Sequence, residues 1–331
     1  MRRIAVTGAG GFIGHHLVRH LKQQGSWVRG IDIKLPEFGP SEADDFQLVD
    51  LRESANATRA LRGIDEVYAL AADMGGMGFI SENEATILHN NTLIDLNSID
   101  GARRAGASRV LYTSSACVYP DYLQELAHAT PLREADALPA APQGGYGWAK
   151  LYGEIALRLF AEQHEIQCRI ARLHNVYGPE GTYTGGREKV PAALCRKVAC
   201  APLHGQVEIW SDGEQTRSFC YIDDCIECIH KLMRSDFSEP LNIGSQEMVS
   251  VNELAALVLR IAQRDDLRLT HVFGPQGVRG RNSDNKLVTQ ALGWAPDTPL
   301  EAGMRITYEW IARQTRTHGD DLAPSVGTGV R

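Results

Sequence analysis

The amino-acid sequence predicts an α/β protein with a doubly wound, parallel sheet, on three observations. Strand-like and helix-like patterns alternate up to about residue 173, a glycine-rich turn follows the first strand, and an acidic residue closes the second strand. Alternating strands and helices require right-handed crossovers between parallel strands. Because ligands bind at the carboxyl ends of such strands, the residues that follow each strand are the candidates for a functional site.

Hydrophobic periodicity places the elements of the first half in order. We expect strands at residues 3–7, 27–31, 46–50, 66–70, 109–113 and 168–173, and helices at 12–24, 51–62, 83–105 and 146–164. The segment 71–78 is rich in glycine and methionine, and we expect a loop there. The strand at 109–113 breaks into Ser114 and Ser115, which puts hydroxyl groups at the ligand-binding edge of the sheet.

The second half of the chain has a different character, because loops lengthen and glycine-rich turns become frequent after residue 173. We therefore expect a first domain at residues 1–173 and a smaller lobe at 174–314, interleaved with the first domain and covering a substrate. The last stretch, 315–331, has no periodicity and is expected to be a flexible tail.

Composition excludes several classes of protein. The chain has 331 residues, of which 43% are hydrophobic and 23% charged, as in an ordinary soluble globular protein. A formal net charge of -7 argues against nucleic acid as a partner. No apolar run approaches the roughly 18 residues of a membrane span. Seven cysteines at scattered spacing indicate reduced thiols and hence a cytoplasmic location.

The glycine-rich turn predicts the cofactor. Gly8, Gly11 and Gly14 follow a strand and open a helix, which allows a pyrophosphate to approach the backbone at a helix N-terminus. Asp32 closes the second strand, where a carboxylate binds the ribose hydroxyls of NAD and repels a 2′-phosphate. This context predicts a Rossmann-type domain that binds NAD. We expect the cofactor to contact Gly8, Gly11, Phe12, Ile13, Gly14, Asp32, Asp50, Tyr146 and Lys150.

Tyr146 and Lys150 stand four residues apart on a predicted helix and therefore share one face. A neighbouring ammonium is expected to lower the pKa of the phenol. Together with the glycine turn and Ser115, this pair resembles the short-chain dehydrogenase/reductase family in its extended, nucleotide-sugar-modifying branch. The resemblance implies that Tyr146 removes the proton of the sugar 4-hydroxyl, that Lys150 binds the nicotinamide ribose, and that Ser115 orients the hydroxyl.

Further segments sharpen this resemblance. They are similar to segments of GDP-mannose 3,5-epimerases and lie at residues 71–80, 114–120, 185–189, 215–219 and 277–285. The similarity runs from about residue 1 to 312. It implies NAD-dependent inversion of GDP-mannose at C3 and C5, giving GDP-L-galactose and, by inversion at C5 alone, GDP-L-gulose. It also implies a homodimer and an acid–base pair formed by Cys117 and Lys189.

The chemistry of inversion independently requires such a pair. A ring carbon that bears only hydrogen and hydroxyl cannot be deprotonated near neutral pH, but oxidation of C4 to a ketone makes the hydrogens on C3 and C5 acidic. Each inversion then needs a base on one face of the sugar and an acid on the other. NADH must stay bound and return its hydride to C4. Without the resemblance, a cysteine after a strand is more often a small buried residue, and a lysine is more often a surface charge.

A nucleotide diphosphate needs cationic anchors. Arginine forks match phosphate oxygens, and lysine acts as a point charge. Lys197, Arg217 and Arg279 are the expected anchors, with Arg281 as a fourth candidate; the alternative is that these residues are solvated or paired with acids. The residues expected to touch the substrate are Met74, Gly75, Asn175, Lys189, Lys197, Gln215, Arg217 and Arg279.

Three alternative functions stay open: a nucleotide-sugar 4-epimerase, a 4,6-dehydratase, or an NAD-binding regulator without activity. A dehydratase of this branch would carry Asp-Glu where this chain has Ala116 and Cys117. A 4-epimerase would not need Cys117 and Lys189 together. A regulator tends to lose Tyr146 or Lys150, and both are present.

No metal site is expected from the sequence. Cys225 and Cys228 have a CxxC spacing, but no second pair accompanies them and they fall in an amphipathic helix pattern. His16 and His20 stand four residues apart on the first helix. Because nothing else nearby in the sequence supplies ligands, we interpret this pair as part of a solvated helix face.

Overall fold

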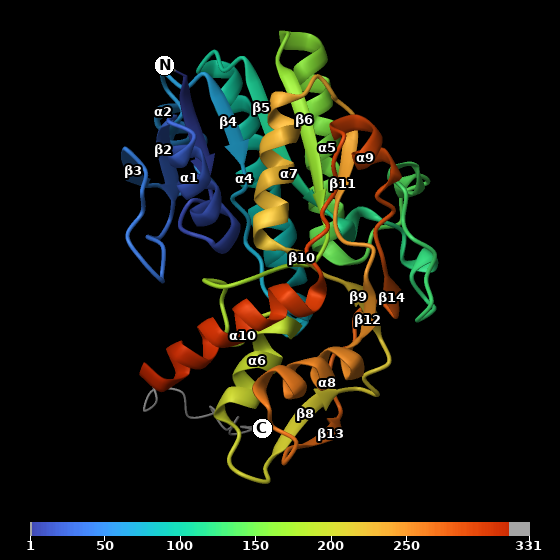
Figure 1. Ribbon diagram of the computed structural model, residues 1–331. Helices are drawn as coiled ribbons and strands as arrows, with labels where there is room; N and C mark the ends of the chain where they lie inside the picture. Colours follow the sequence, from blue (N-terminus) through green and yellow to red (C-terminus); the bar gives the residue numbers. More distant parts are fainter. Residues whose placement is uncertain (1, 318–331) are drawn as a thin grey trace, which may run out of the picture.

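The computed structural model describes residues 2–317 and has a seven-stranded sheet at its centre (Figure 1). All neighbouring strands in this sheet are parallel. Their order is β11 (Pro240–Ile243), β6 (Gln167–Leu173), β5 (Arg109–Ser115), β4 (Glu66–Ala69), β1 (Arg3–Thr7), β2 (Trp27–Asp32) and β3 (Asp45–Leu48). This is the strand order of a dinucleotide-binding sheet with one strand added at an edge, so the predicted Rossmann-type α/β fold is confirmed.

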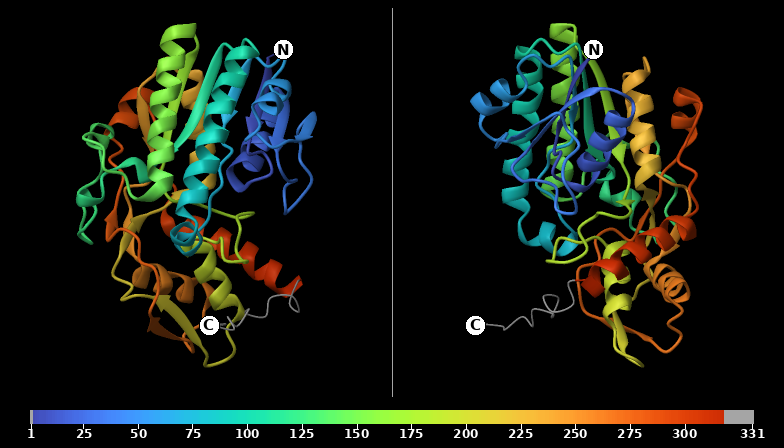
Figure 2. Two further views of the ribbon diagram at one scale, coloured as in Figure 1. Left: turned by 180° about the vertical axis from the view of Figure 1, so that it is seen from behind. Right: turned by 60° about the vertical axis from the view of Figure 1, so that its left-hand side comes forward.

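Helices cover both faces of the sheet. On one face, α1 (Phe12–Gln23) contacts α7 (Ile222–Arg234); on the other, α4 (Glu84–Arg104) packs between α2 (Ser54–Ala60) and α5 (Gly144–His164), as Figure 2 shows from behind. The helices pack on the sheet because each has an apolar face. In α1, for example, the apolar residues recur at helical spacing and are buried against the sheet. The sheet is therefore sandwiched, and its carboxyl ends stay open toward the rest of the chain.

A smaller lobe lies beyond those carboxyl ends (Figures 1 and 2). Its helices are α6 (Val190–Cys200), α8 (Val251–Ala262) and α10 (Leu300–Thr317). Its strands are β8 (Gln206–Trp210) with β13 (Arg268–Val272), and β9 (Thr216–Ser218) between β12 (Met248–Ser250) and β14 (Gly280–Arg281). The remaining elements are α3 (Met77–Glu82), α9 (Lys286–Leu292), the pair β7 (Val176–Tyr177) and β10 (Cys220–Tyr221), and the 3-10 turns η1 (Ala116–Val118), η2 (Asp121–Leu123) and η3 (Glu134–Ala137).

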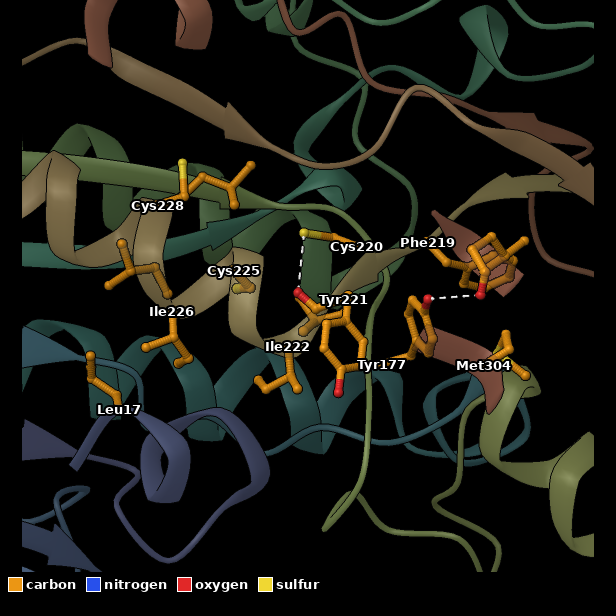
Figure 3. Packing of buried hydrophobic residues seen from close by; sticks show 14 of the residues in the cluster. Leu17, Tyr177, Phe219, Cys220, Tyr221, Ile222, Cys225, Ile226, Cys228 and Met304 are labelled. Atoms are coloured by element: carbon orange, nitrogen blue, oxygen red, sulfur yellow. Dashed lines mark hydrogen bonds between the residues drawn. The ribbon is translucent and has the colours of Figure 1, made fainter. Parts of the chain in front are cut away.

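One hydrophobic core joins the lobe to the sheet. It begins between α1 and α7 with residues such as Leu17 and Ile226 and continues through Tyr177 and Tyr221 to Met304 on α10 (Figure 3). The strand β11 and the helix α7 come from the second half of the chain but pack on the first sheet. A shared core of this kind fixes the position of the lobe against the sheet.

The structure departs from several predicted boundaries. Ser114 and Ser115 do not follow β5 but belong to it, because they pair with the end of β6. The second predicted helix is shorter than expected, and the predicted loop at 71–78 ends in α3, which begins at Met77. The predicted tail begins too early, since α10 continues to Thr317; the rest of that tail lies outside the described residues. In the described chain, every helix is too short or too polar to cross a membrane.

Candidate active site

A cleft of about 680 Å³ lies along the carboxyl ends of the sheet strands, between the sheet and the lobe. It joins the glycine turn, the ends of β4 and β5, and the segment that leads into α6. The predicted site residues that line it are Gly8, Gly11, Phe12, Ile13, Gly14, Asp32, Asp50, Met74, Gly75, Ser115, Tyr146, Lys150, Asn175 and Lys189. We name two ends of this cleft after the roles predicted for their residues: a cofactor end around Gly8, Asp32 and Lys150, and a sugar end around Lys189, beside Cys117.

The turn between β1 and α1 forms the cofactor end, and it fits a dinucleotide. Gly8 has a φ of +74°, and a Cβ on Gly14 would overlap the Gly8 carbonyl oxygen. No side chain caps the first turn of α1 at Gly11, so its backbone N–H groups are available to an anion. A larger residue at Gly8 or Gly14 would clash with the backbone and disrupt this turn.

Two carboxylates lie beside this turn. The Asp32 carboxylate accepts hydrogen bonds from the backbone N–H of Gly10 at 2.9 Å and of Lys34 at 3.2 Å, which holds it at the end of β2. Asp50 lies two residues beyond β3 and is bound by Arg52, with Nη2 at 2.6 Å from Oδ2. That hydrogen bonding lowers the pKa of Asp50. Arg52 also lines the cleft, and sequence analysis did not single it out.

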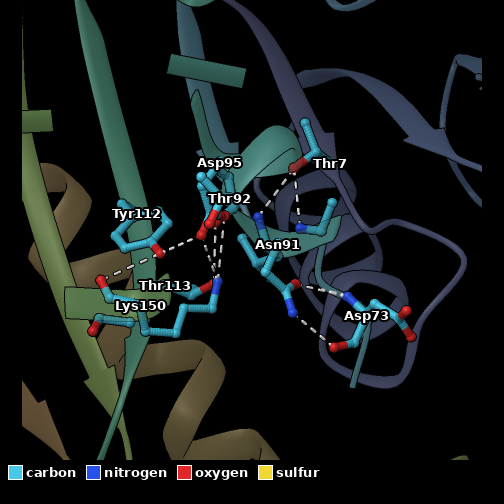
Figure 4. A network of polar contacts seen from close by, with 12 residues as sticks. Thr7, Asp73, Asn91, Thr92, Asp95, Tyr112, Thr113 and Lys150 are labelled. Atoms are coloured by element: carbon cyan, nitrogen blue, oxygen red, sulfur yellow. Dashed lines mark hydrogen bonds and ion pairs between the residues drawn. The ribbon is translucent and has the colours of Figure 1, made fainter. Parts of the chain in front are cut away.

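Lys150 is held by a buried carboxylate that sequence analysis missed. Its side chain is 1% exposed, and Nζ lies 3.4 and 3.5 Å from the two oxygens of Asp95 on α4 (Figure 4). Asp95 also accepts a hydrogen bond of 2.6 Å from the Tyr112 hydroxyl. Burial raises the pKa of Asp95, and the charge of Lys150 opposes this rise. Four residues before Asp95, the buried Asn91 lies on the same helix face, and this polar pair within a buried stripe was the available signal.

Tyr146 does not have the lowered pKa predicted from the Tyr–Lys spacing. Burial raises its pKa, and the neighbouring Cys117 and Asp95 raise it further, whereas a hydrogen bond with Ser115 lowers it. Lys150 Nζ lies 5.9 Å from the centroid of the Tyr146 ring and is already paired with Asp95. The prediction is wrong because it counted the ammonium but neither its carboxylate partner nor the burial of the phenol.

Cys117 lies in η1, beside the sugar end but outside the residues that line the cleft. The Ser115 hydroxyl accepts a hydrogen bond of 3.2 Å from the Cys117 backbone N–H, and a Cβ on Gly147 of α5 would overlap the Cys117 carbonyl oxygen. Arg281 of β14 donates a hydrogen bond of 3.4 Å from Nη1 to the thiol sulfur. Burial alone would raise the pKa of the Cys117 thiol, but Arg281, Ser115 and Lys189 outweigh it, and the pKa lies below its ordinary value.

Lys189 stands immediately before α6 and faces the cleft, where it stays open to water. The walls of the cleft replace much of the water around its ammonium, and this desolvation lowers the pKa of Lys189. The charge of Cys117 acts in the opposite direction. The two groups therefore influence each other electrostatically.

The lobe contributes two arginines near Cys117. Arg217 and Arg281 are partners in the register of β9 and β14. Arg217 donates hydrogen bonds to the carbonyl oxygens of Thr216 and Val278. One nitrogen of Arg281, Nη2, is buried without a hydrogen-bond partner within residues 2–317. Among the described residues neither arginine forms an ion pair with a carboxylate. Positive charge is thus concentrated near Cys117, although neither arginine lines the cleft.

The other predicted anchors have partners within the protein. Arg279 pairs with Asp212 at 2.8 Å on the surface, and Lys197 donates a hydrogen bond of 2.7 Å to the Glu208 carbonyl oxygen. Asn175 donates to the Ser218 carbonyl oxygen at 3.0 Å. The buried Gln215 donates to the Trp210 carbonyl oxygen at 3.3 Å, and in the described part of the chain its own side-chain oxygen has no partner. Arg281, expected only as a fourth anchor, is the arginine that contacts Cys117.

The remaining sequence candidates are structural or differ from expectation. Cys225 and Cys228 belong to α7 and are fully buried in the core (Figure 3). The interpretation of His16 as solvated is wrong: it is 8% exposed, and its Nε2 lies 3.1 Å from the Pro179 carbonyl oxygen. His20 is partly exposed and contacts His230 of α7.

The sequence matches the NAD-dependent epimerase/dehydratase family over residues 4–244. The chain therefore belongs to the NAD-dependent epimerase/dehydratase family, whose cofactor is NAD, and the predicted family and cofactor are confirmed. The cleft with its glycine turn and Asp32 fits that cofactor.

Particular relatives can then be compared. The chain is 49% identical over 326 residues to GDP-mannose 3,5-epimerase of Arabidopsis thaliana, covering 97% of this chain and 86% of that protein. It is 48% identical to GDP-mannose 3,5-epimerase 1 of Oryza sativa subsp. japonica, covering 97% and 85%. A solved structure of UDP-glucose 4-epimerase from Thermotoga maritima with UDP-glucose is similar with a TM-score of 0.84 and 25% identity, covering 94% of this chain and 99% of that chain.

Proposed function

We propose that this protein is a GDP-mannose 3,5-epimerase, which converts GDP-mannose to GDP-L-galactose and, by inversion at C5 alone, to GDP-L-gulose. The observation that carries the proposal is the Cys117 thiol, whose pKa is lowered by Arg281 and Lys189 beside the buried Tyr146. Oxidation at C4 needs only Tyr146 and its neighbours. A second acid–base group at the same cleft is what inversion at C3 and C5 requires. The names and the high identity of the plant relatives support the same substrate.

The cofactor end prepares C4 for oxidation. NAD, when bound, supplies the group that accepts a hydride from C4 and later returns it. Ser115, which hydrogen-bonds Tyr146, orients the sugar 4-hydroxyl, and Tyr146 takes the proton from that oxygen. Lys150, fixed by Asp95, holds the nicotinamide ribose. Glycines 8, 11 and 14, with Phe12, Ile13, Asp32 and Asp50, hold the rest of the dinucleotide.

The sugar end then exchanges protons at C3 and C5. The lowered pKa of Cys117 favours a thiolate, which can remove the proton from one face of the ring. The lowered pKa of Lys189 makes its ammonium a better proton donor near neutral pH, so it can protonate the opposite face. The two residues exchange roles when the reaction runs in reverse.

The lobe holds the nucleotide diphosphate. Arg217 and Arg281, which have no carboxylate partner among the described residues, supply the positive charge, and Arg279 and Lys197 join them by exchanging their surface partners for phosphate oxygens. We assign Met74, Gly75, Asn175 and Gln215 to the sugar and the neighbouring phosphate. The proposal treats residues 1–173 as the cofactor domain and 174–314 as the substrate lobe.

We also propose a cytoplasmic homodimer. The outer faces of α4 and α5 expose large apolar side chains between 40% and 52% of their surface, which a second copy would cover: Leu88, Trp148, Tyr152, Ile155 and Leu159. The seven cysteines are free, as expected of a reducing compartment. Sedimentation of the pure protein would give the molecular mass of the assembly.

The function is tested by incubating the pure protein with GDP-mannose in deuterated water without added NAD. Proton NMR is expected to show deuterium at C3 and C5 and the signals of new hexose isomers, because retained NAD is recycled. Inversion at C4 alone would instead indicate a 4-epimerase, and loss of the 6-hydroxyl would indicate a 4,6-dehydratase. A protein that retains NAD but leaves every sugar unchanged would be a regulator.

A further inference from the structure

Three side chains that can ligate a metal ion gather between α1 and α7, outside the lining of the catalytic cleft. They are His20 of α1 and Glu227 and His230 of α7, and their nitrogen and oxygen ligand atoms all lie within 4.8 Å of one another. His20 Nε2 lies 2.7 Å from His230 Nδ1. All three residues are partly exposed, so the group can be reached from solvent without unfolding.

We propose that these residues form a binding site for a divalent transition-metal ion, with Zn²⁺ as the best fit, which fastens α1 to α7. Two imidazoles and one carboxylate are a common ligand set for zinc, with a fourth position left to water. Ligand bonds of about 2.0–2.2 Å in a tetrahedron separate the ligand atoms by roughly 3.4 Å. The two hydrogen-bonded nitrogens lie closer than this, at 2.7 Å, and all the ligand atoms lie within 4.8 Å of one another. Small side-chain rotations would bring the three atoms to the tetrahedral spacing.

The local structure favours this use of the three side chains. Glu227 and His230 stand three residues apart on α7 and therefore share one helix face, and His20 approaches from α1. A surface pocket of about 380 Å³, lined in part by Glu227 and His230, leaves room for a water ligand.

Two cations lie near this group and define what the metal must displace. Lys231 pairs with Glu227 at 3.1 Å, and both side chains are about 40% exposed, so this ion pair is weak. Arg234 pairs with Glu66 instead and does not occupy the ligand atoms. A metal ion would therefore exchange this weak surface pair and the hydrogen bond between His20 and His230 for three ligand bonds.

The consequence of the site is mechanical. The first turn of α1 faces the cofactor end of the cleft, whereas α7 belongs to the second half of the chain and follows β10. A bond through the metal would tie these two segments near their outer surface, in addition to the core between them. The expected effect is on stability and does not require any change in catalysis.

The test uses metal-free full-length protein carrying Cys117→Ser, since the active-site thiol is itself a zinc ligand. Equilibrium dialysis against Zn²⁺ is expected to give one ion per chain, and saturating Zn²⁺ is expected to raise the thermal midpoint. Glu227→Gln and His20→Gln, each added to that background, should weaken Zn²⁺ binding at least about tenfold, the loss typical even of residues that only support a ligand.

The matched control is His164→Gln, which removes an exposed histidine at the end of α5 and should leave Zn²⁺ binding unchanged. Glu227→Gln preserves the size of the side chain, so a loss of zinc with an unchanged metal-free midpoint cannot be attributed to misfolding. Binding that is equally strong in the Glu227→Gln and parent proteins, or the absence of bound Zn²⁺ in the parent, would overturn the proposal.

Discussion

Two buried cations, Lys150 and Arg281, have opposite environments. Lys150 is buried against the carboxylate of Asp95, so its charge is largely balanced inside the protein. Arg281 is also buried, but it donates to the Cys117 thiol, and no carboxylate in the described chain pairs with it. The pKa values of the neighbouring acids differ accordingly: the pKa of Tyr146 is raised, and the pKa of Cys117 is lowered.

This difference shows that the partner of a buried cation decides its effect on a neighbouring acid. The cofactor end carries a complete hydrogen-bonded network around Lys150, which fixes geometry (Figure 4). The sugar end keeps positive charge without a carboxylate partner, with an unpaired Arg281 nitrogen, and this charge acts on the thiol. We expect changes at the sugar end to alter proton exchange and changes at the cofactor end to alter stability and oxidation.

The largest effect is expected from Cys117→Ala, which removes the proposed base of the sugar end. Exchange of the C3 and C5 hydrogens with deuterated solvent should fall about 10²- to 10⁴-fold, the usual contribution of general acid–base catalysis. Oxidation at C4 should persist, because Tyr146, Ser115 and Lys150 are untouched. Proton NMR measures the exchange, and the near-ultraviolet absorbance of bound NADH measures the oxidation.

Cys200→Ala is the matched control for this prediction, since Cys200 is a free cysteine exposed at the end of α6. Its exchange rates should equal those of the unchanged protein. Undiminished exchange in Cys117→Ala would remove the thiol from the mechanism. Loss of NADH formation in that variant would mean that the two ends of the cleft do not act separately.

A smaller effect, on stability, is expected from Asp95→Asn at the cofactor end. The change leaves the buried charge of Lys150 without a counter-ion, and breaking a buried pair in this way costs about 3–5 kcal/mol of unfolding free energy. Asp95 also raises the pKa of Tyr146, so its neutralisation should lower that pKa and move the pH dependence of C4 oxidation to lower pH. Urea denaturation and the pH profile of NADH formation measure the two effects.

Asp100→Asn on the same helix provides the comparison. Asp100 pairs with Arg103 at 2.7 Å and Arg104 at 2.6 Å near the surface, and such pairs contribute about 1 kcal/mol or less. Asp100→Asn should therefore change the urea midpoint little and leave the pH profile of NADH formation unchanged. Equal losses of stability in the two variants would show that Asp95 is not a special partner of Lys150.

The cofactor end could be predicted from the sequence because its signals are local. Gly8 to Gly14 form one short turn, Asp32 follows the next strand, and Tyr146 and Lys150 are one helical turn apart. Local spacing determines local geometry in such cases. The alternation of strands and helices predicted the parallel sheet for the same reason.

The sugar end could not be derived in this way, because its contacts join distant segments. Cys117 and Arg281 are 164 positions apart, and only the packing of β14 near η1 brings them together. Asp95 carries no motif and is recognised only once Lys150 is seen beside it. The predicted pKa of Tyr146 failed for the same reason, since burial and the carboxylate partner depend on tertiary structure.

The smallest effect is expected from Arg281→Gln, which tests whether the charge of Arg281 lowers the pKa of the Cys117 thiol. Loss of the guanidinium leaves burial less opposed, so the pKa of the Cys117 thiol should rise. A rise of about one unit would reduce the thiolate fraction near neutral pH roughly tenfold. The pH profile of thiol alkylation by iodoacetamide should shift to higher pH, and the pH profile of exchange at C5 should shift with it.

Arg279→Gln, which removes a surface arginine paired with Asp212, should weaken substrate binding without moving the alkylation profile. If both variants alkylate with the pH profile of the unchanged protein, Arg281 does not activate Cys117, and the lowered thiol pKa must come from Ser115 and Lys189.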